Sequence, residues 1–204
     1  MNYQDFRNKF NELGCFSAHQ VGVAFPNFDR NNLTRWQRKG YILKLRQGFY
    51  SFAEYVSQPN FVFFISNYIY KPSYISLHSA LAFYGIIPEA VTQITAVSAL
   101  KTAGFENGFG SFSYMKIKED LFFGYDILPL GKRNVLMAQP EKAILDLLYL
   151  YPFYNTGSEI ENLRFDEHFI FNELNIEKLA MYLDKFKNKN LKKRVKFFTD
   201  LHNI

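Results

Sequence analysis

The sequence predicts an α+β protein, in which helices and strands occupy separate stretches of the chain. Apolar residues recur every three or four positions in residues 3–38, which is the spacing of amphipathic helices. Between residues 93 and 138 they fall in short strand-like runs separated by Gly-rich or polar turns. Two further amphipathic stretches close the chain. Helices grouped at both ends of a strand-rich region are typical of an α+β fold.

Length and charge limit the classes of protein that fit. The chain has 204 residues and is 48% hydrophobic, which is enough for one full domain and a small one, and excludes a disordered or fibrous protein. The net charge is +5, and residues 1–60 account for +4 of it. This concentration of positive charge in the N-terminal part of the chain favours a polyanionic partner.

The sequence also predicts a compartment. Cys15 is the single cysteine, so an intramolecular disulfide framework is excluded. The first residues lack the charged and apolar regions of a secretory signal. The apolar run at 61–70 is interrupted by Ser66 and Asn67, and it is about half as long as a bilayer-spanning helix. We therefore expect a cytoplasmic protein without membrane contact.

Two short helices are predicted at the start. A helix over Tyr3–Leu13 places Phe6, Phe10 and Leu13 on one apolar face, and Gly14 ends it. A second helix is expected over 17–24. His19 lies in this second helix with no His, Cys or acidic residue at ligand spacing, which favours a surface or capping role over a metal ligand.

A basic helix follows, with Asp29 as its expected N-cap and Gly40 as its expected C-cap. Leu33 and Trp36 share one face, which is suited to a core. The opposite face is polar and consists of Asn31, Thr34, Arg35 and Arg38.

After Gly40 the apolar period drops to two. Leu43 and Leu45 alternate with Ile42, Lys44 and Arg46, and a turn at Gln47-Gly48 leads into residues 49–53. Three helices followed by a two-stranded hairpin are the order of a winged helix-turn-helix, which we assign to residues 1–56.

The charges of this unit predict a DNA-binding surface. From Arg30 to Arg46 the chain carries +6 without an acidic residue. A helix fits the major groove, where Arg reads guanine and Asn reads adenine, while hairpin cations lie against phosphates. We expect base contacts from Asn31, Thr34, Arg35 and Arg38, and phosphate contacts from Arg30, Lys39, Lys44 and Arg46. The alternative is a solvated charged face without a partner.

Residues 57–204 form the predicted second domain, a mixed α/β unit with a mainly antiparallel sheet and C-terminal helices. Helices are expected at 60–70 after Pro59, and at 77–84, where Ser76 is the cap and His78 a packing residue. Four strands are expected at Gln93–Ser98, Phe112–Ile117, Phe122–Leu128 and Val135–Ala138.

A strongly apolar helix is expected over 140–151, opened by Pro140. Lys142 and Asp146 are one turn apart on it, which predicts an ion pair on the helix surface, with a catalytic carboxylate as the alternative. Residues 153–172 appear irregular, and two amphipathic helices follow at 173–186 and 191–202. The lysine-rich join between them, from Lys185 to Lys196, is either solvated or a second nucleic-acid surface.

Three blocks in this order resemble one known family. The first is 33–50, which ends in Arg46-Gln47-Gly48-Phe49-Tyr50 and looks like an Arg-x-Gly-x-Tyr hairpin motif. The second is 74–81 with 84–89, and the third is 138–146, which contains Pro140-Glu141-Lys142-Ala143. Together they resemble the AbiEi-like antitoxins of abortive-infection type IV toxin–antitoxin systems, which are also transcriptional regulators.

The resemblance implies a bipartite protein that serves in phage defence. Its winged helix would bind inverted repeats in double-stranded DNA upstream of its own operon. Its C-terminal domain would counteract a nucleotidyltransferase-type toxin, without a requirement for stable contact. The expected function is therefore a DNA-binding autorepressor and antitoxin, without enzymatic activity, cofactor or metal.

Two alternatives stay open at this stage. One is a nucleotidyltransferase-like enzyme, because Gly110-Ser111 precedes Asp120 and Gly157-Ser158 precedes Asp166-Glu167, although neither stretch has an Asp-x-Asp pair for two cations. The other is a stand-alone ligand-sensing regulator, whose aromatic residues line an apolar pocket in the second domain.

Overall fold

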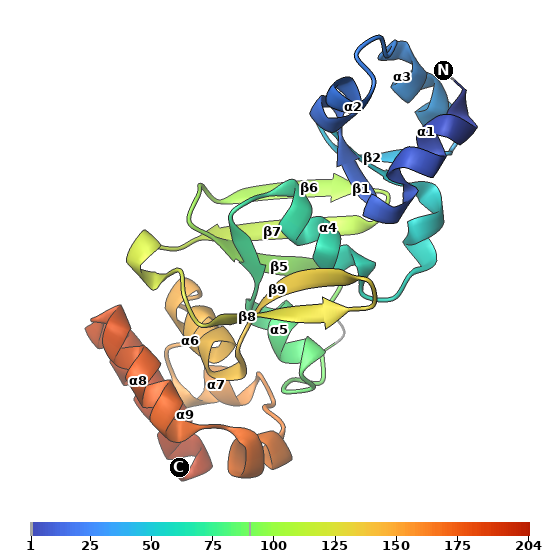
Figure 1. Ribbon diagram of the computed structural model, residues 1–204. Helices are drawn as coiled ribbons and strands as arrows, with labels where there is room; N and C mark the ends of the chain where they lie inside the picture. Colours follow the sequence, from blue (N-terminus) through green and yellow to red (C-terminus); the bar gives the residue numbers. More distant parts are fainter. Residues whose placement is uncertain (1, 90) are drawn as a thin grey trace.

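The computed structural model describes residues 2–89 and 91–204, which form an N-terminal unit and a larger second unit (Figure 1). The N-terminal unit has three helices and a three-stranded antiparallel sheet in the order β1-β3-β2. Its elements are α1 (Tyr3–Phe10), β1 (Cys15–Ser17), α2 (Ala18–Ala24), α3 (Asn31–Arg38), β2 (Ile42–Arg46) and β3 (Phe49–Phe52).

Local sequence explains where the first two helices begin and end. α2 opens with a capping box, in which the Ser17 hydroxyl accepts from the Gln20 amide and the Gln20 side chain accepts from the Ser17 amide. α1 ends at Phe10 and passes into a 3₁₀ turn, Asn11–Leu13. The prediction that Leu13 shares the buried face of Phe6 and Phe10 is wrong: Leu13 is 46% exposed, because the tighter turn breaks the helical spacing.

The β2–β3 hairpin departs from simple alternation. Its register shifts between Lys44 and Arg46, which is a β-bulge or similar irregularity. As a result Ile42 and Leu45 are both buried although they are three residues apart, whereas Leu43, expected on the same face as Leu45, is only partly buried. β1, which pairs with β3, was not predicted because it is only three residues long.

The second unit contains a six-stranded sheet in the order β6-β7-β5-β4-β9-β8. Three neighbouring pairs are antiparallel (β6–β7, β5–β4 and β9–β8), and two are parallel (β7–β5 and β4–β9). Its strands are β4 (Ser73–Ile75), β5 (Gln93–Ser98), β6 (Ala103–Asn107), β7 (Gly110–Lys116), β8 (Tyr125–Leu130) and β9 (Arg133–Ala138).

The sequence predicted four of these six strands. β4 was missed because three residues between two helices carry too little pattern. β6 was missed because Gly104, Glu106 and Asn107 are poor strand formers. β8 begins at Tyr125 rather than at the predicted Phe122, since residues 119–121 form a 3₁₀ turn.

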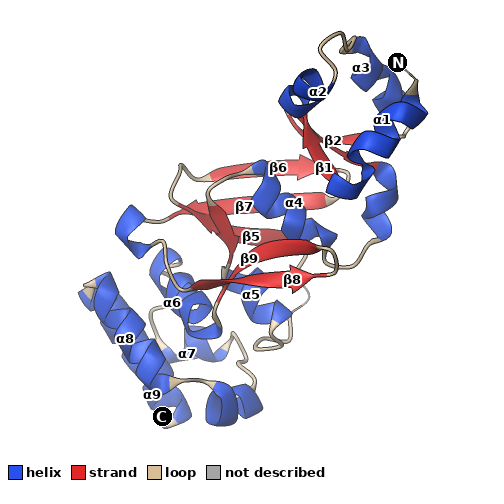
Figure 2. Ribbon diagram, viewed as in Figure 1, coloured by secondary structure: helices blue, strands red, loops and turns tan. Residues whose placement is uncertain are grey.

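Helices cover both faces of this sheet (Figure 2). α4 (Phe61–Ile69) lies on one face, where the Tyr114 hydroxyl of β7 donates to the Ser66 carbonyl. α5 (Leu77–Phe83) lies on the other face, where the Thr95 amide of β5 donates to the Ser79 hydroxyl. α6 (Pro140–Leu150) packs on α5, and α8 (Ile176–Phe186) and α9 (Lys189–His202) cover α6. The stretch expected to be irregular contains α7 (Gly157–Glu161) and a π-helical turn, Phe169–Glu173.

The two units are in direct contact. The Asn107 side-chain amide donates to the Leu45 carbonyl at 3.1 Å, which ties β6 to β2. On another part of the boundary, the Arg133 guanidinium lies 4.6 Å from the ring centre of Tyr55 and 4.8 Å from that of Phe61. In the part of the chain that the structure describes, no helix has the length and apolar character to span a bilayer.

Lys142 and Asp146 form an ion pair, but the prediction that it lies on the helix surface is wrong, because both side chains are 0% exposed. The Lys142 ammonium donates to Asp146 and to the Tyr74 hydroxyl, and the hydroxyls of Tyr74 and Ser76 donate to Asp146 at 2.9 Å. Burial raises the pKa of the Asp146 carboxyl and lowers the pKa of the Lys142 ammonium, and their mutual attraction opposes both shifts. Sequence spacing could not show this burial, since α6 is enclosed on every side.

Because of this network, we expect single and double substitutions to lower the free energy of unfolding by different amounts. Asp146→Ala leaves a buried ammonium without its counter-ion and should lower the free energy of unfolding by about 3–5 kcal/mol. The double variant Lys142→Met/Asp146→Leu should recover more than half of that loss in urea denaturation. A loss below about 1 kcal/mol for Asp146→Ala would instead match an exposed pair.

Candidate nucleic-acid interface

The anchoring of α3 determines which of its faces is free. Leu33 and Trp36 are 4% and 5% exposed, as the helix spacing predicts. The Trp36 ring lies 4.6 Å from Phe6, 5.4 Å from Tyr3 and 5.8 Å from Phe28, measured between ring centres. These aromatic contacts hold one side of α3 against α1 and the preceding loop.

Both ends of α3 are closed by local hydrogen bonds. The Asp29 carboxylate accepts from the Asn31 amide at 2.9 Å, so it contacts the first turn from one position earlier than the N-cap, which is Arg30. At the other end Gly40 adopts φ +70°, and the Tyr41 amide donates to the Trp36 carbonyl at 3.0 Å. This turn directs the chain from α3 straight into β2.

The opposite side of α3 is open to solvent. All of the predicted base-contacting residues are exposed, and so are three of the four predicted phosphate-contacting residues: Asn31, Thr34, Arg35, Arg38, Arg30, Lys39 and Lys44. Within residues 2–89 and 91–204, none of the cations in this set forms an ion pair with a carboxylate. We call these residues the α3 face: Asn31, Thr34, Arg35 and Arg38 share one side of the helix by their spacing, Arg30 and Lys39 flank its ends, and Lys44 lies on β2.

Arg46 is placed differently. It is partly buried, and its guanidinium lies 4.5 Å from the ring centre of Phe49 and 5.5 Å from that of Phe105, on the edge strand of the second unit. Arg46 therefore lies at the boundary between the units and not on the α3 face.

α3 has the thickness that entry into a duplex groove needs. An α-helix with its side chains is about 10–12 Å across, close to the width of the major groove. α3 lies at the outer end of the molecule, and the second unit does not cover it (Figure 1).

The lysine-rich join covers the end of α8, the two residues after it and the first half of α9, and it lies at the opposite end of the molecule (Figure 1). Most of its cations are exposed, and Lys192 donates to Asp184 at 2.8 Å. Arg194 is partly buried and donates to the Leu148 carbonyl. Because of this separation, the join cannot extend the α3 face along the same groove.

The other residues considered as metal ligands or catalytic groups lie on separate elements. His19 is exposed, and His78 lies 3.2 Å from the Tyr154 hydroxyl, where burial lowers the pKa of its imidazole. Asp120 is exposed on a 3₁₀ turn, and the Asp166 carboxylate accepts from the Phe169 amide. The described residues contain no group of three or more His, Cys, Asp and Glu placed to hold a metal ion.

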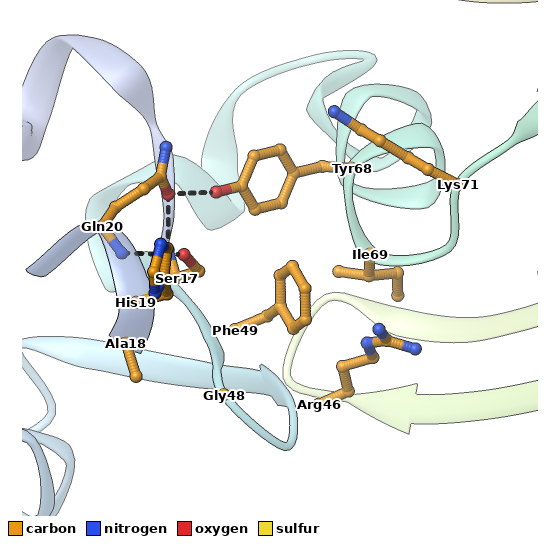
Figure 3. A pocket seen from close by; sticks show the side chains of 10 residues that line it. All are labelled: Ser17, Ala18, His19, Gln20, Arg46, Gly48, Phe49, Tyr68, Ile69 and Lys71. Carbon is orange, nitrogen blue, oxygen red and sulfur yellow. Dashed lines mark hydrogen bonds between the residues drawn. The ribbon is translucent and has the colours of Figure 1, made fainter. Parts of the chain in front are cut away.

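Sequence reasoning missed a groove between the units, which is lined in part by Gln20, Tyr68 and Lys71 (Figure 3). These residues come from α2 and from the end of α4, which are far apart in the chain. The only available signal was the basic and aromatic character of Tyr68-Ile69-Tyr70-Lys71, which is equally typical of a helix end.

The chain matches no protein-family model, and no curated protein matches it significantly.

The two sides of α3 should respond differently to substitution. Leu33→Ala removes buried methyl groups and should lower the free energy of unfolding by about 2–5 kcal/mol. Arg35→Ala should change it by less than about 0.5 kcal/mol, because this side chain is exposed. Urea denaturation of the two variants beside the unsubstituted protein measures both values, and a large loss for Arg35→Ala would place its side chain in the core.

Proposed function

We propose that the N-terminal unit is a winged helix-turn-helix that binds double-stranded DNA through α3. The observation that carries this proposal is the α3 face: a set of exposed cations without carboxylate partners, on a helix whose other side is fixed by Trp36. Like charges gathered without counter-ions favour a polyanion, and their attraction to DNA releases condensed counter-ions.

Within this proposal the residues have separate roles. Arg35 and Arg38 present guanidinium groups that pair in bidentate fashion with guanine, and Asn31 suits adenine. Arg30 and Lys39 at the ends of α3, and Lys44 on the hairpin, hold backbone phosphates and set the orientation of the helix. Arg46 is not part of the α3 face, since its guanidinium lies against aromatic rings at the boundary.

We further propose that the whole chain is an autorepressor and antitoxin of the AbiEi-like type, directed against a nucleotidyltransferase-type toxin. Support comes from the motif blocks that carry this resemblance. Tyr74 and Ser76 belong to the second block and Lys142 and Asp146 to the third, and these side chains form one buried network. Residues that define the resemblance thus stabilise a single structural unit.

The DNA-binding role is tested with a duplex taken from the region upstream of the gene. Arg38→Ala should weaken binding roughly 5- to 150-fold, the equivalent of one bidentate base contact of about 1–3 kcal/mol. Lys44→Ala should weaken binding evenly across sequences and reduce the slope of log affinity against log salt by about one. Gel shifts at several salt concentrations give both quantities.

Lys118→Ala is the matched control, because Lys118 is exposed on the second unit and forms no recorded ion pair within the described residues. Its binding should equal that of the unsubstituted protein. If Arg38→Ala and Lys44→Ala also bind unchanged, the α3 face is not the DNA site.

The antitoxin role requires a separate test by co-expression. Cells that express a nucleotidyltransferase toxin encoded beside this gene should resume growth when the full chain is supplied. The double variant Arg35→Ala/Arg38→Ala should restore growth equally well, because neutralisation is assigned to the second unit, while its repression of the promoter is lost. Growth arrest that persists with the unsubstituted chain at normal expression would contradict the antitoxin role.

A further inference from the structure

A groove of about 600 Å³ runs along the boundary between the two units. Four segments meet there: the start of α2, the turn of the β2–β3 hairpin, the following residues of β3 and the end of α4 (Figure 3). Its volume is within the range of small-molecule sites. Its lining includes Ser17, Gln20, Arg46, Phe49, Tyr68 and Lys71.

Two cations and two aromatic rings form a continuous row along this groove. The Arg46 guanidinium lies 4.5 Å from the ring centre of Phe49, and the Lys71 ammonium lies 5.1 Å from that of Tyr68. The two rings contact each other edge to face, with 5.7 Å between their centres. The row therefore combines flat apolar surface with positive charge at both ends.

Among the described residues, no carboxylate lines the groove to balance these cations. Arg46 is partly buried, and its Nε atom is inaccessible to solvent and has no hydrogen-bond acceptor within the described residues. A partly buried guanidinium is normally paired, because desolvation without a counter-ion is costly. The enclosed Nε is as closed to a ligand as to water, so an incoming anion would pair with the terminal nitrogens of the guanidinium.

The groove also has a fixed frame. The side-chain oxygen Oε1 of Gln20 accepts from the Tyr68 hydroxyl at 2.7 Å and from the Ser17 backbone amide at 2.7 Å (Figure 3). Partial burial raises the pKa of Tyr68 to about 12, so this hydroxyl keeps its proton at neutral pH. Gln20 thus joins the two units across the groove while leaving the cations free.

We propose that this groove binds a phosphate ester that carries an aromatic base, the chemistry of a nucleotide. The phosphate pairs with the cation at one end of the row, Arg46 or Lys71, and the base lies against Phe49 and Tyr68 toward the other cation, since cations and aromatic faces together recognise nucleotides. The same chemistry has two sources, a free nucleotide or a nucleotide unit of bound DNA.

Occupancy of the groove acts on the hairpin. Arg46 and Phe49 flank the Gln47-Gly48 turn, so a ligand held between them and Lys71 fixes the hairpin against the second unit. A free nucleotide would then change DNA affinity, and DNA would change nucleotide affinity by the same factor. This coupling rests on the proposed DNA binding, whereas binding of the nucleotide itself does not.

The test uses the full chain, with adenosine and guanosine 5′-monophosphate as probes in calorimetric titrations. The variants are Lys71→Gln, which removes an exposed cation, and Arg46→Gln, with Lys118→Gln as the control outside the groove. If a free nucleotide is the ligand, the unsubstituted protein and Lys118→Gln bind one or both probes, and the two groove variants bind at least tenfold more weakly.

A second arm measures binding to the upstream duplex without nucleotide. If DNA supplies the phosphate, neither probe binds, and Lys71→Gln weakens duplex binding severalfold more than Lys118→Gln does. If Lys71→Gln weakens neither nucleotide binding nor duplex binding, the proposed groove site is refuted, even if Arg46→Gln fails to fold. Failure of the unsubstituted protein to bind the duplex refutes the DNA-binding role alone, and the nucleotide titration still decides the groove.

Discussion

The burial of Trp36 against the rings of α1 is the contact on which the N-terminal unit depends. Trp36 and Leu33 fix the rotation of α3, so the cations on its other side face solvent together and cannot turn toward the core. Gly40 then allows an immediate turn into β2, so Lys44 follows the end of α3 by only a few residues in the sequence. The packing of one side of α3 thus determines that the cations on its other side are exposed.

In the second unit, charged side chains are buried and paired, whereas those of α3 are exposed. Lys142 and Asp146 lie in the interior with Tyr74 and Ser76, where each polar group has a partner. Such a network joins β4 to α6, and it favours one arrangement of the elements over others of similar hydrophobic content. At the boundary between the units, by contrast, Arg46 and Lys71 have aromatic neighbours and form no ion pair with a carboxylate in the part of the chain that the structure describes. The paired charges favour one packing arrangement, and the cations without carboxylate partners lie on the surfaces for which we propose ligands.

Local patterns in the sequence were sufficient for much of this structure. The spacing of Leu33 and Trp36 predicted the buried side of α3, and Pro140 predicted the start of α6. The features that the sequence did not predict depend on distant contacts. The shift in the β2–β3 register, the pairing of β4 with β9 and the burial of Lys142 follow from what packs against each segment. For the same reason, the sequence placed Arg46 with the other basic residues, although tertiary contacts hold it at the boundary.

Hydrogen exchange of the full chain, with and without the upstream duplex, tests most directly that DNA meets the outer side of α3. Amides in residues 31–46 should exchange more slowly in the complex, while those at the far end, in residues 185–196, should be unchanged. Slower exchange in residues 185–196 with none in residues 31–46 would show that the duplex binds the lysine-rich join, and it would contradict the account.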